Sequence, residues 1–447
     1  MEKKRKGLSA GGILTVLALV LVPLAIGVFL MPGGGGSGNY SSYAGPVLPM
    51  TAVRGGENLE VRRNVNFDLS AYEQERKNGL DTGAAVITDT YELTNTTPES
   101  VTVELAYGFE GQFTDPAEQF PAISVDGQPL QTEILASVDT DGALHRADSW
   151  DAYKKELTET DHLAAALTPA EVPEIPVTVV RLSGFRYTLP DSAEAVPVGT
   201  DPVFVGAEFA IPEGTTVWTP HFHMTRQEDG LWQVYSREEV ELYFVGAAPE
   251  EIRPVANIGY NVRENTILTV QDRQEVRFAS ALTELLHKAA MAYDFWAENE
   301  GYPDPGFLTP ERLFQGALKR IAHPDYRYAS GEIRAMSGVF YDVVSEIRML
   351  YRVFEVTVPA GETVTVEAVF TQEASYDFGG PKKYREGYDM ATTLGSNLNF
   401  TEQTSSLTGW EFIEIVKQNF GFDLRKEITE VKLDLAVERY YLDVRAK

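Results

Sequence analysis

Cysteine is absent from the 447-residue chain. Its absence excludes a disulfide framework, a thiolate metal site, a cysteine nucleophile and lipid attachment through cysteine. A folded region without disulfides depends on an ordinary apolar core, and 43% of the residues are hydrophobic. This content is ample for such a core, and the length predicts about two domains.

Basic residues are scarce, with 38 Lys and Arg against 66 Asp and Glu and a formal net charge of -28. A surface with this excess of carboxylates repels phosphate backbones and anionic lipid headgroups. The composition therefore excludes nucleic-acid binding. We interpret the acidic surface as an aid to solubility. The alternative interpretation is that it attracts divalent cations or a basic partner.

Sequence signatures of nucleophilic catalysis and phosphate binding are also missing. The chain has no Gly-x-Ser-x-Gly elbow, no Ser-x-x-Lys box at the start of a predicted helix and no glycine-rich loop after a strand. Glu239 and Glu241 could serve a glycosidase in principle, but they are expected on the solvent face of a strand whose other face carries Val240, Leu242 and Phe244. Among 66 acidic residues, however, close pairs arise by chance. We predict no catalytic residue, and a hydrolase stays as an alternative.

Two motifs resemble metal sites but are incomplete. His221 and His223 point to one face of a predicted strand, yet no third ligand is identifiable nearby. The segment 139–142, Asp-Thr-Asp-Gly, resembles the start of a calcium loop, whose twelfth position must be Glu. That position is Trp150, so a tight turn is the better interpretation. We predict no metal and no cofactor, and leave open whether the histidine pair binds an ion.

One long apolar run is present near the N-terminus. Residues 13–31 carry no charge and follow the basic cluster Lys3 to Lys6. A helix of about 20 residues crosses a hydrocarbon core of about 30 Å, and basic residues stay on the cytoplasmic side. The run predicts a basic cytoplasmic tail (1–12), a transmembrane helix (13–31) and an extracytoplasmic remainder (32–447). The alternative is a cleaved signal peptide, but Phe29 to Pro32 make a poor cleavage site.

The residues after this run predict a flexible spacer. Gly33 to Gly38 read Gly-Gly-Gly-Gly-Ser-Gly, which is typical of a tether and gives the range 32–49. Residues 189–193, Leu-Pro-Asp-Ser-Ala, resemble a sortase signal but lack the hydrophobic segment and basic tail that follow such signals. The apolar run is therefore the anchor that we predict.

Alternating β-branched and aromatic residues predict an N-terminal β-sandwich region over 50–137. Strands are expected at Val86–Asn95 and Val101–Phe109 with a turn between them, and Val125 to Gln128 form a hairpin turn signal. The segment 91–107 aligns without gaps on 354–370. This similarity indicates either two related sandwich modules or convergence on the pattern of a half-exposed hairpin.

The rest of the chain mixes strands and helices. A helical connector (150–167) and strands near 177–182, 203–211, 234–244 and 261–270 define a middle region (138–275). A helical insertion (276–325) follows, with helices at 277–300 and after Thr309. The C-terminal region (326–447) is expected to be β, with alternation from Val431 to Val437. Residues 410–420 fit either a strand or a helix opened by a capping box of Thr408 and Glu411.

The segment 91–109, followed by Val125-Asp126-Gly127, resembles exported, membrane-anchored bacterial proteins with β-sandwich ectodomains. The shared pattern is a Tyr-x-Leu-x-Asn strand, a polar turn, a Val-Thr-Val strand and a Val-Asp-Gly turn. It implies a surface location and carries no known active site.

We therefore expect a mainly β, sandwich-like fold with antiparallel sheets and a helical insertion, α+β overall, with one N-terminal transmembrane helix. We expect a non-catalytic binding, structural or envelope-associated role, with an envelope polymer or surface protein as partner. The alternatives are an extracytoplasmic hydrolase acting on envelope polymer and a sensor that signals through a membrane partner.

Overall fold

The computed structural model describes the chain from residue 40 with gaps. The described residues are 40, 42–73, 83–115, 119–137, 146–169, 176–182, 204–220, 223–236, 240–258, 261–263, 270–277, single positions between 283 and 290, 309–322, 333–376 and 385–447. The predicted cytoplasmic tail and transmembrane helix lie outside them, as do residues 32–39 and 41 of the predicted tether. The tether prediction is wrong for the remaining residues, because Tyr40, Tyr43 and residues 45–49 are buried in the fold and Pro46–Val47 form strand β1. Within the described ranges, no helix combines the length and apolar character needed to cross a membrane.

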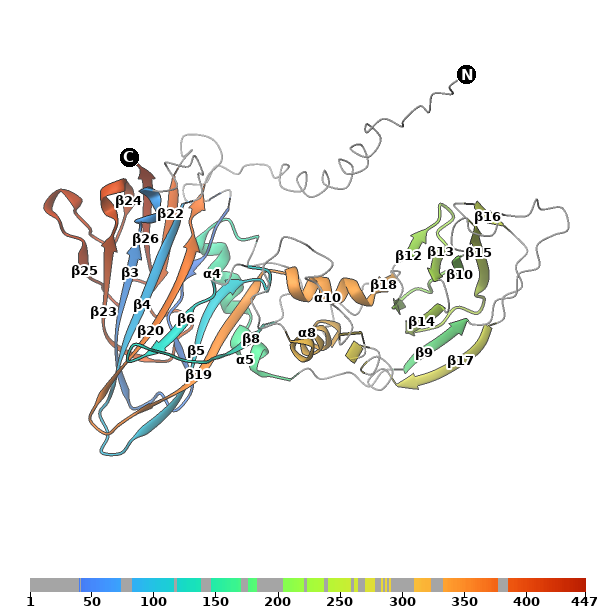
Figure 1. Cartoon of the computed structure of the whole chain (residues 1–447), viewed down its shortest axis with the longest axis horizontal. Helices are drawn as coiled ribbons and strands as arrows, with labels where there is room; N and C mark the ends of the chain where they lie inside the picture. The colour runs from blue at the N-terminus through green and yellow to red at the C-terminus, as the bar shows by residue number, and fades with distance from the viewer. Residues whose placement is uncertain are drawn as a thin grey trace, which may run out of the picture. The chain divides into compact units, whose positions relative to one another are not determined.

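Two β-sheets, in whose strands buried and outward-facing side chains alternate, form a β-sandwich-like unit (Figure 1). The larger sheet has seven strands, in the order β25-β23-β3-β4-β20-β6-β7, and the smaller has four, in the order β2-β5-β19-β8. The larger sheet comprises β25 (Glu430–Lys432), β23 (Asn399–Thr408), β3 (Leu59–Asp68), β4 (Ala84–Asn95), β20 (Thr363–Glu373), β6 (Ala122–Val125) and β7 (Gln128–Pro129). The smaller comprises β2 (Thr51–Arg54), β5 (Val101–Gly111), β19 (Arg348–Val358) and β8 (Glu133–Ala136).

The core of this unit follows from strand alternation. Successive side chains of a strand point to opposite faces of the sheet, so every second residue, which is mostly apolar, is buried. Val65, Ile87, Val103, Val356 and Val366, from both sheets, belong to one buried cluster. The same cluster includes residues of a further sheet, made of β1 (Pro46–Val47), β22 (Glu386–Ala391), β26 (Arg439–Ala446) and β24 (Ile413–Gln418), with β21 (Ser375–Tyr376) beside β22.

The two similar strand pairs are not hairpins. β4 and β5 belong to different sheets, as do β19 and β20. Instead, β4 pairs antiparallel with β20, and β5 with β19, so both pairs build one sandwich. The interpretation as two separate sandwich modules is therefore wrong. Alternation determines which face of a strand is buried, but it does not determine the neighbouring strand.

The turn predicted at Val125 to Gln128 is confirmed. β6 and β7 pair there, with Val125 opposite Gln128. Asp126 and Gly127 have φ values of 48° and 75°, as a two-residue hairpin turn requires. The Asp126 carboxylate also accepts the backbone N–H of Thr365 at 2.9 Å, which fixes the turn on β20.

The middle of the chain builds two further five-stranded sheets. One comprises β12 (His223–Arg226), β13 (Trp232–Ser236), β10 (Phe204–Phe209), β15 (Arg253–Ile258) and β16 (Asn261–Arg263). The other comprises β17 (Val270–Arg277), β9 (Pro176–Leu182), β14 (Val240–Val245), β11 (Thr216–Thr219) and β18 (Ile333–Ala335). Residues predicted as single strands at 234–244 and 261–270 thus belong to two strands each.

Strand β14 is buried on both faces. Val240, Leu242 and Phe244 lie in one apolar cluster, as predicted. Tyr243 and Val245, on the opposite face, lie in another. The face that includes Glu241 is therefore not the solvent face that the alternation predicted, because a second apolar layer packs against it.

The predicted helical connector forms two short helices, α4 (Trp150–Glu159) and α5 (His162–Leu167). Asp161 separates them, and its side chain accepts the N–H of Ala164 at 2.9 Å as an N-cap. The predicted helix at 277–300 lies mostly outside the described residues, although Leu286 and Ala290 are helical and buried.

The helix predicted after Thr309 is confirmed as α8 (Pro310–Ala322). Thr309 Oγ1 accepts the N–H of Arg312 at 3.3 Å, and Pro310 is the first helical residue. Five apolar residues on one side of this helix are buried, namely Leu313, Phe314, Ala317, Leu318 and Ile321. A further helix, α10 (Met336–Ser345), lies in the region that was expected to be β throughout.

Two C-terminal predictions need correction. Residues 410–420 form a 3-10 turn (Trp410–Phe412) followed by β24, and the N-cap is Gly409 without a side-chain bond, so the capping box is wrong. The alternating stretch from Val431 pairs as a strand only through Lys432. Beyond it, Asp434 Oδ1 accepts the N–H of Ala436 at 2.9 Å and turns the chain.

Candidate functional site

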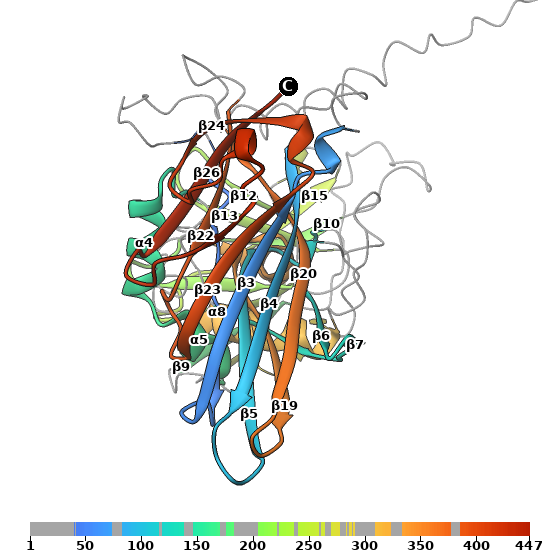
Figure 2. The ribbon, with the colours of Figure 1, turned by 90° about the vertical axis from the view of Figure 1, so that its left-hand side faces the viewer.

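The outward-facing side of the seven-stranded sheet is the candidate functional site (Figure 2). Its side chains alternate with the buried residues of five neighbouring strands, and Figure 2 looks onto four of these strands lying side by side. We call these residues the outer face: Glu430 and Lys432; Glu402, Thr404, Ser406 and Thr408; Glu60, Arg62, Asn64, Asn66 and Asp68; Val86, Thr88, Thr90, Glu92 and Thr94; Thr363, Thr365, Glu367, Val369 and Thr371.

Strand register arranges the outer face in rows. One row runs across five strands as Lys432, Thr404, Asn64, Thr90 and Glu367. The next row runs as Glu430, Ser406, Asn66, Thr88 and Val369. Neighbours lie about 4.8 Å apart across strands and about 6.7 Å apart along them. Hydroxyl and amide groups therefore form a regular two-dimensional grid.

Hydrogen bonds between neighbouring strands hold several of these side chains in place. Asn64 Nδ2 donates to Thr404 Oγ1 at 2.6 Å. Asn66 accepts the Ser406 hydroxyl at 3.1 Å and donates to Thr408 Oγ1 at 3.3 Å. A hydroxyl or amide can donate and accept at once, so these groups keep bonding capacity toward a ligand while their orientation is set.

Carboxylates outnumber basic groups on the outer face. The acidic residues are Glu60, Asp68, Glu92, Glu367, Glu402 and Glu430, against Arg62 and Lys432. Arg62 lies 3.9 Å from Glu92, and Lys432 lies 2.9 Å from Glu402. Both basic side chains are about two-thirds exposed, so these pairs are weak in water. The remaining carboxylates give the outer face a negative potential.

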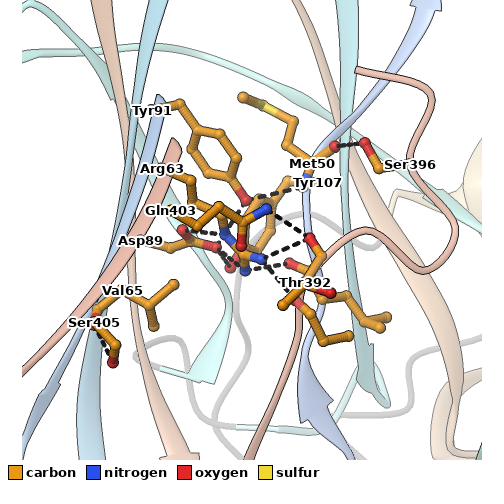
Figure 3. Close-up of polar contacts among 12 residues, drawn as sticks. Met50, Arg63, Val65, Asp89, Tyr91, Tyr107, Thr392, Ser396, Gln403 and Ser405 are labelled. Atoms are coloured by element: carbon orange, nitrogen blue, oxygen red, sulfur yellow. Dashed lines mark hydrogen bonds and ion pairs between the residues drawn. The ribbon is translucent and has the colours of Figure 1, made fainter. Parts of the chain in front are cut away.

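A fully buried ion pair lies on the inner side of the same two strands (Figure 3). Arg63 of β3 contacts both carboxylate oxygens of Asp89 of β4, at 2.9 and 2.8 Å. Tyr91 and Tyr107 donate their hydroxyls to Asp89 at 2.8 and 3.0 Å. Both charged side chains are 0% exposed. We call these four residues the buried cluster.

The buried cluster also ties distant segments to the sheet. Arg63 donates to the carbonyl of Leu48 at 3.2 Å and to that of Ala391 at 2.7 Å. Gln403 of β23 donates to the carbonyl of Thr392 at 2.9 Å, beside this contact (Figure 3). A buried guanidinium is stable only when its donors find partners, and these carbonyls supply them. The cluster therefore fixes β3, β4 and β23 from behind the outer face.

Proton exchange at neutral pH is not expected in the buried cluster. Burial acts to lower the pKa of Arg63, but the Asp89 carboxylate more than compensates and the pKa lies above its usual value. Burial raises the pKa of Tyr91 and Tyr107 well above that of free tyrosine. Arg63 stays charged and both phenols stay neutral, so the cluster serves as a fixed support.

A second cluster joins the first described residues to the C-terminal strands. Tyr40 donates its hydroxyl to Asp443 at 2.7 Å, and Arg385 lies 2.9 Å from the same carboxylate. The Tyr40 ring packs against Arg385, whose guanidinium carbon is 4.6 Å from the ring centre. A Cβ atom at Gly387 would meet the Tyr40 hydroxyl oxygen at 2.4 Å, so a larger residue there would force this ring to shift.

The same cluster continues around Asp389. Tyr43 donates its hydroxyl to this carboxylate, and Arg439 lies 2.8 Å from it. The Arg439 guanidinium carbon is 5.6 Å from the Trp150 ring centre. Burial raises the pKa of Asp389, which Arg439 and Tyr43 oppose. We call Tyr40, Tyr43, Arg385, Asp389, Arg439 and Asp443 the peripheral cluster.

The residues singled out as chemical candidates are not brought together in the described part of the chain. His221, Glu239 and the segments 139–142 and 189–193 lie outside the described residues, and so does the His223 side chain. Glu241 pairs with Arg181 at 2.5 Å. Among the described residues, no group of three or more His, Asp or Glu side chains is placed to hold a metal ion.

The buried cluster has a signal in the sequence, although neither of its charged residues was predicted as a site residue. Arg63 falls in the same alternating phase as Val61 and Val65, and Asp89 falls between Ile87 and Tyr91. A charge in the apolar phase of a strand indicates a buried, paired group.

Comparison with known proteins adds no assignment, because no protein-family model, no curated protein and no solved structure matches this chain.

Proposed function

We propose that this protein is a non-catalytic binding protein of the cell surface and that the outer face is its binding surface. The observation that carries the proposal is the grid of hydroxyl and amide side chains across β25, β23, β3, β4 and β20. Several of these groups are held by neighbours yet keep bonding capacity. The partner that we expect is an envelope polymer or a surface protein.

The position of the buried cluster supports binding over catalysis. Catalytic acids and bases must reach their substrate. Arg63 and Asp89 instead face the core and are 0% exposed. Their contacts restrain the strands that present Asn64 and Thr90 on the opposite side. A surface held in one conformation loses less entropy when a ligand binds.

The surface location rests on the sequence. The uncharged run at residues 13–31 and the basic cluster before it favour a single membrane helix with the remainder outside. Protease treatment of intact cells tests this orientation. The expected result is cleavage of residues 50–447, and their survival while a known surface protein is cut would contradict it.

Substitution of Thr90 tests the binding surface. The full-length chain in non-ionic detergent is incubated with washed cell-envelope fractions, and bound protein is measured after centrifugation. Thr90→Arg places a long charged side chain at the centre of the grid and should weaken retention about tenfold, equivalent to about 1.4 kcal/mol.

Thr102→Arg is the matched control. Thr102 is also a strand threonine that alternates with buried residues, and it is exposed where Thr90 is half-buried, but it lies on β5 in the four-stranded sheet. It should leave retention unchanged. Equal retention of the Thr90→Arg and wild-type chains, with both folded, would show that the outer face is not the binding surface.

A further inference from the structure

We infer that the outer face binds an amine-bearing polysaccharide, and this inference rests on the proposed function of that face as a binding surface. Three features of the outer face support this inference, namely few apolar anchors, the bonding capacity of its grid and its negative charge.

Apolar anchors are scarce on the outer face. Its described side chains include no aromatic residue, and Val86 and Val369 are its apolar members. Protein interfaces are anchored by buried aromatic, methionine and arginine side chains, which supply most of the binding energy. The outer face does not offer such a centre, so a folded protein is a poor match. A polymer that binds mainly through polar groups is a better one.

The grid matches a ligand rich in hydroxyl groups. Thr88, Thr90, Thr404 and Ser406 can each donate one hydrogen bond and accept others. Asn64 and Asn66, which lie between them in the rows, offer an amide donor and a carbonyl acceptor. A sugar hydroxyl can also donate and accept, so it can bond to any of these side chains without leaving a donor or an acceptor unpaired. A ligand with repeated hydroxyls can therefore contact several rows at once.

The negative charge of the outer face indicates which kind of polysaccharide it binds. Arg62 and Lys432 are each accompanied by a carboxylate. The described hydrogen bonds and ion pairs assign no partner to Glu60, Glu367 or Glu430. Glu367 lies in the row that contains Asn64 and Thr90, on the opposite side of them from Lys432. This arrangement repels uronic acid and phosphate polymers and attracts protonated sugar amines. The charge complementarity therefore favours an amine-bearing chain over a neutral one.

Calorimetry with defined oligosaccharides tests the inference on the full-length chain in detergent. The probe is an oligomer of β-1,4-linked glucosamine, and the comparison probes are its N-acetylated counterpart, a neutral glucan and an anionic uronic acid oligomer. We expect the glucosamine oligomer to bind at least about tenfold tighter than the acetylated one, with an affinity that falls as salt rises.

Removing the carboxylate of Glu367 tests whether the glucosamine oligomer binds at the outer face. Glu367→Gln keeps the side-chain shape and should weaken glucosamine binding about threefold, while Glu367→Lys should weaken it at least about tenfold. The matched control is Glu355→Gln, which removes the same charge from an exposed position of β19. It should leave the affinity unchanged.

The outcomes separate the two proposals. If the neutral or acetylated oligomer binds as tightly as the amine, or if Glu355→Gln acts as strongly as Glu367→Gln, the amine inference is wrong. The proposed function still holds in that case if Thr90→Arg releases the protein from envelope fractions. If Thr90→Arg has no effect there, both proposals fail.

Discussion

The buried and peripheral clusters use the same three residue types in different surroundings. Each joins arginine to aspartate and adds tyrosine hydroxyls as donors. The buried cluster has one carboxylate and one guanidinium, both 0% exposed. The peripheral cluster has two of each, and the Arg439 side chain keeps 25% exposure. The comparison shows how burial changes what an ion pair contributes to the fold.

In the buried cluster, neither charge has access to water. Removing charges from water costs several kcal/mol for each ion, and their attraction repays this only when geometry and further hydrogen bonds are favourable. Asp89 meets that condition through Arg63, Tyr91 and Tyr107. In the peripheral cluster, water reaches Arg439, so loss of one contact there is partly compensated. The first cluster should therefore be much less tolerant of substitution.

The largest effect is expected from Asp89→Asn. It leaves the Arg63 charge buried without its counter-ion, and breaking such a pair typically costs about 3–5 kcal/mol. Urea denaturation of the full-length chain measures the loss in unfolding free energy. Arg63→Met combined with Asp89→Leu is the control, because it removes both charges and should recover part of the loss. A decrease below about 1 kcal/mol for Asp89→Asn would contradict the assigned role.

The sequence predicts many of the strands, but little of which strand pairs with which. Alternation in 86–95 and 101–109 marked two strands, and Thr309 with Pro310 marked a helix start. Alternation shows which side chains share a face. It does not show that β4 lies beside β20, which follows it by more than two hundred residues. The connection at 96–100 therefore suggested a hairpin where the chain changes sheets.

The candidate site could not be predicted without knowing which strands pair. Thr88 and Thr90 are recognisable as an outward-facing set within one strand. The rows also need β23, which runs parallel to β3 with Thr404 opposite Asn64. The pairing of Arg63 with Asp89 depends on the same register. Such long-range register is set by the folded core, so one strand pattern is compatible with several partners.

A smaller effect is expected from Tyr43→Phe in the peripheral cluster. The ring is kept, but Asp389 loses one donor while Arg439 remains in contact. Loss of a buried hydrogen bond to a charged group should lower the unfolding free energy by about 1.5–3 kcal/mol. Tyr351→Phe is the control, because it also removes a hydroxyl from a buried tyrosine but lies outside both clusters. A loss as large as that of Asp89→Asn would show that the two clusters do not differ in tolerance.

The smallest effect is expected from an exposed ion pair beside the peripheral cluster. Lys154 of α4 lies 2.6 Å from Glu438, with side-chain exposures of 34% and 55%. Water solvates both groups when the contact breaks, so Lys154→Met should change the unfolding free energy by about 0.2–1 kcal/mol, and less at high salt. Urea denaturation at low and high salt measures the difference. A short distance is common to this pair and to Arg63 with Asp89. If Lys154→Met costs much less than Asp89→Asn, exclusion of water determines the contribution of each of these two pairs; a loss above about 2 kcal/mol for Lys154→Met would favour distance instead.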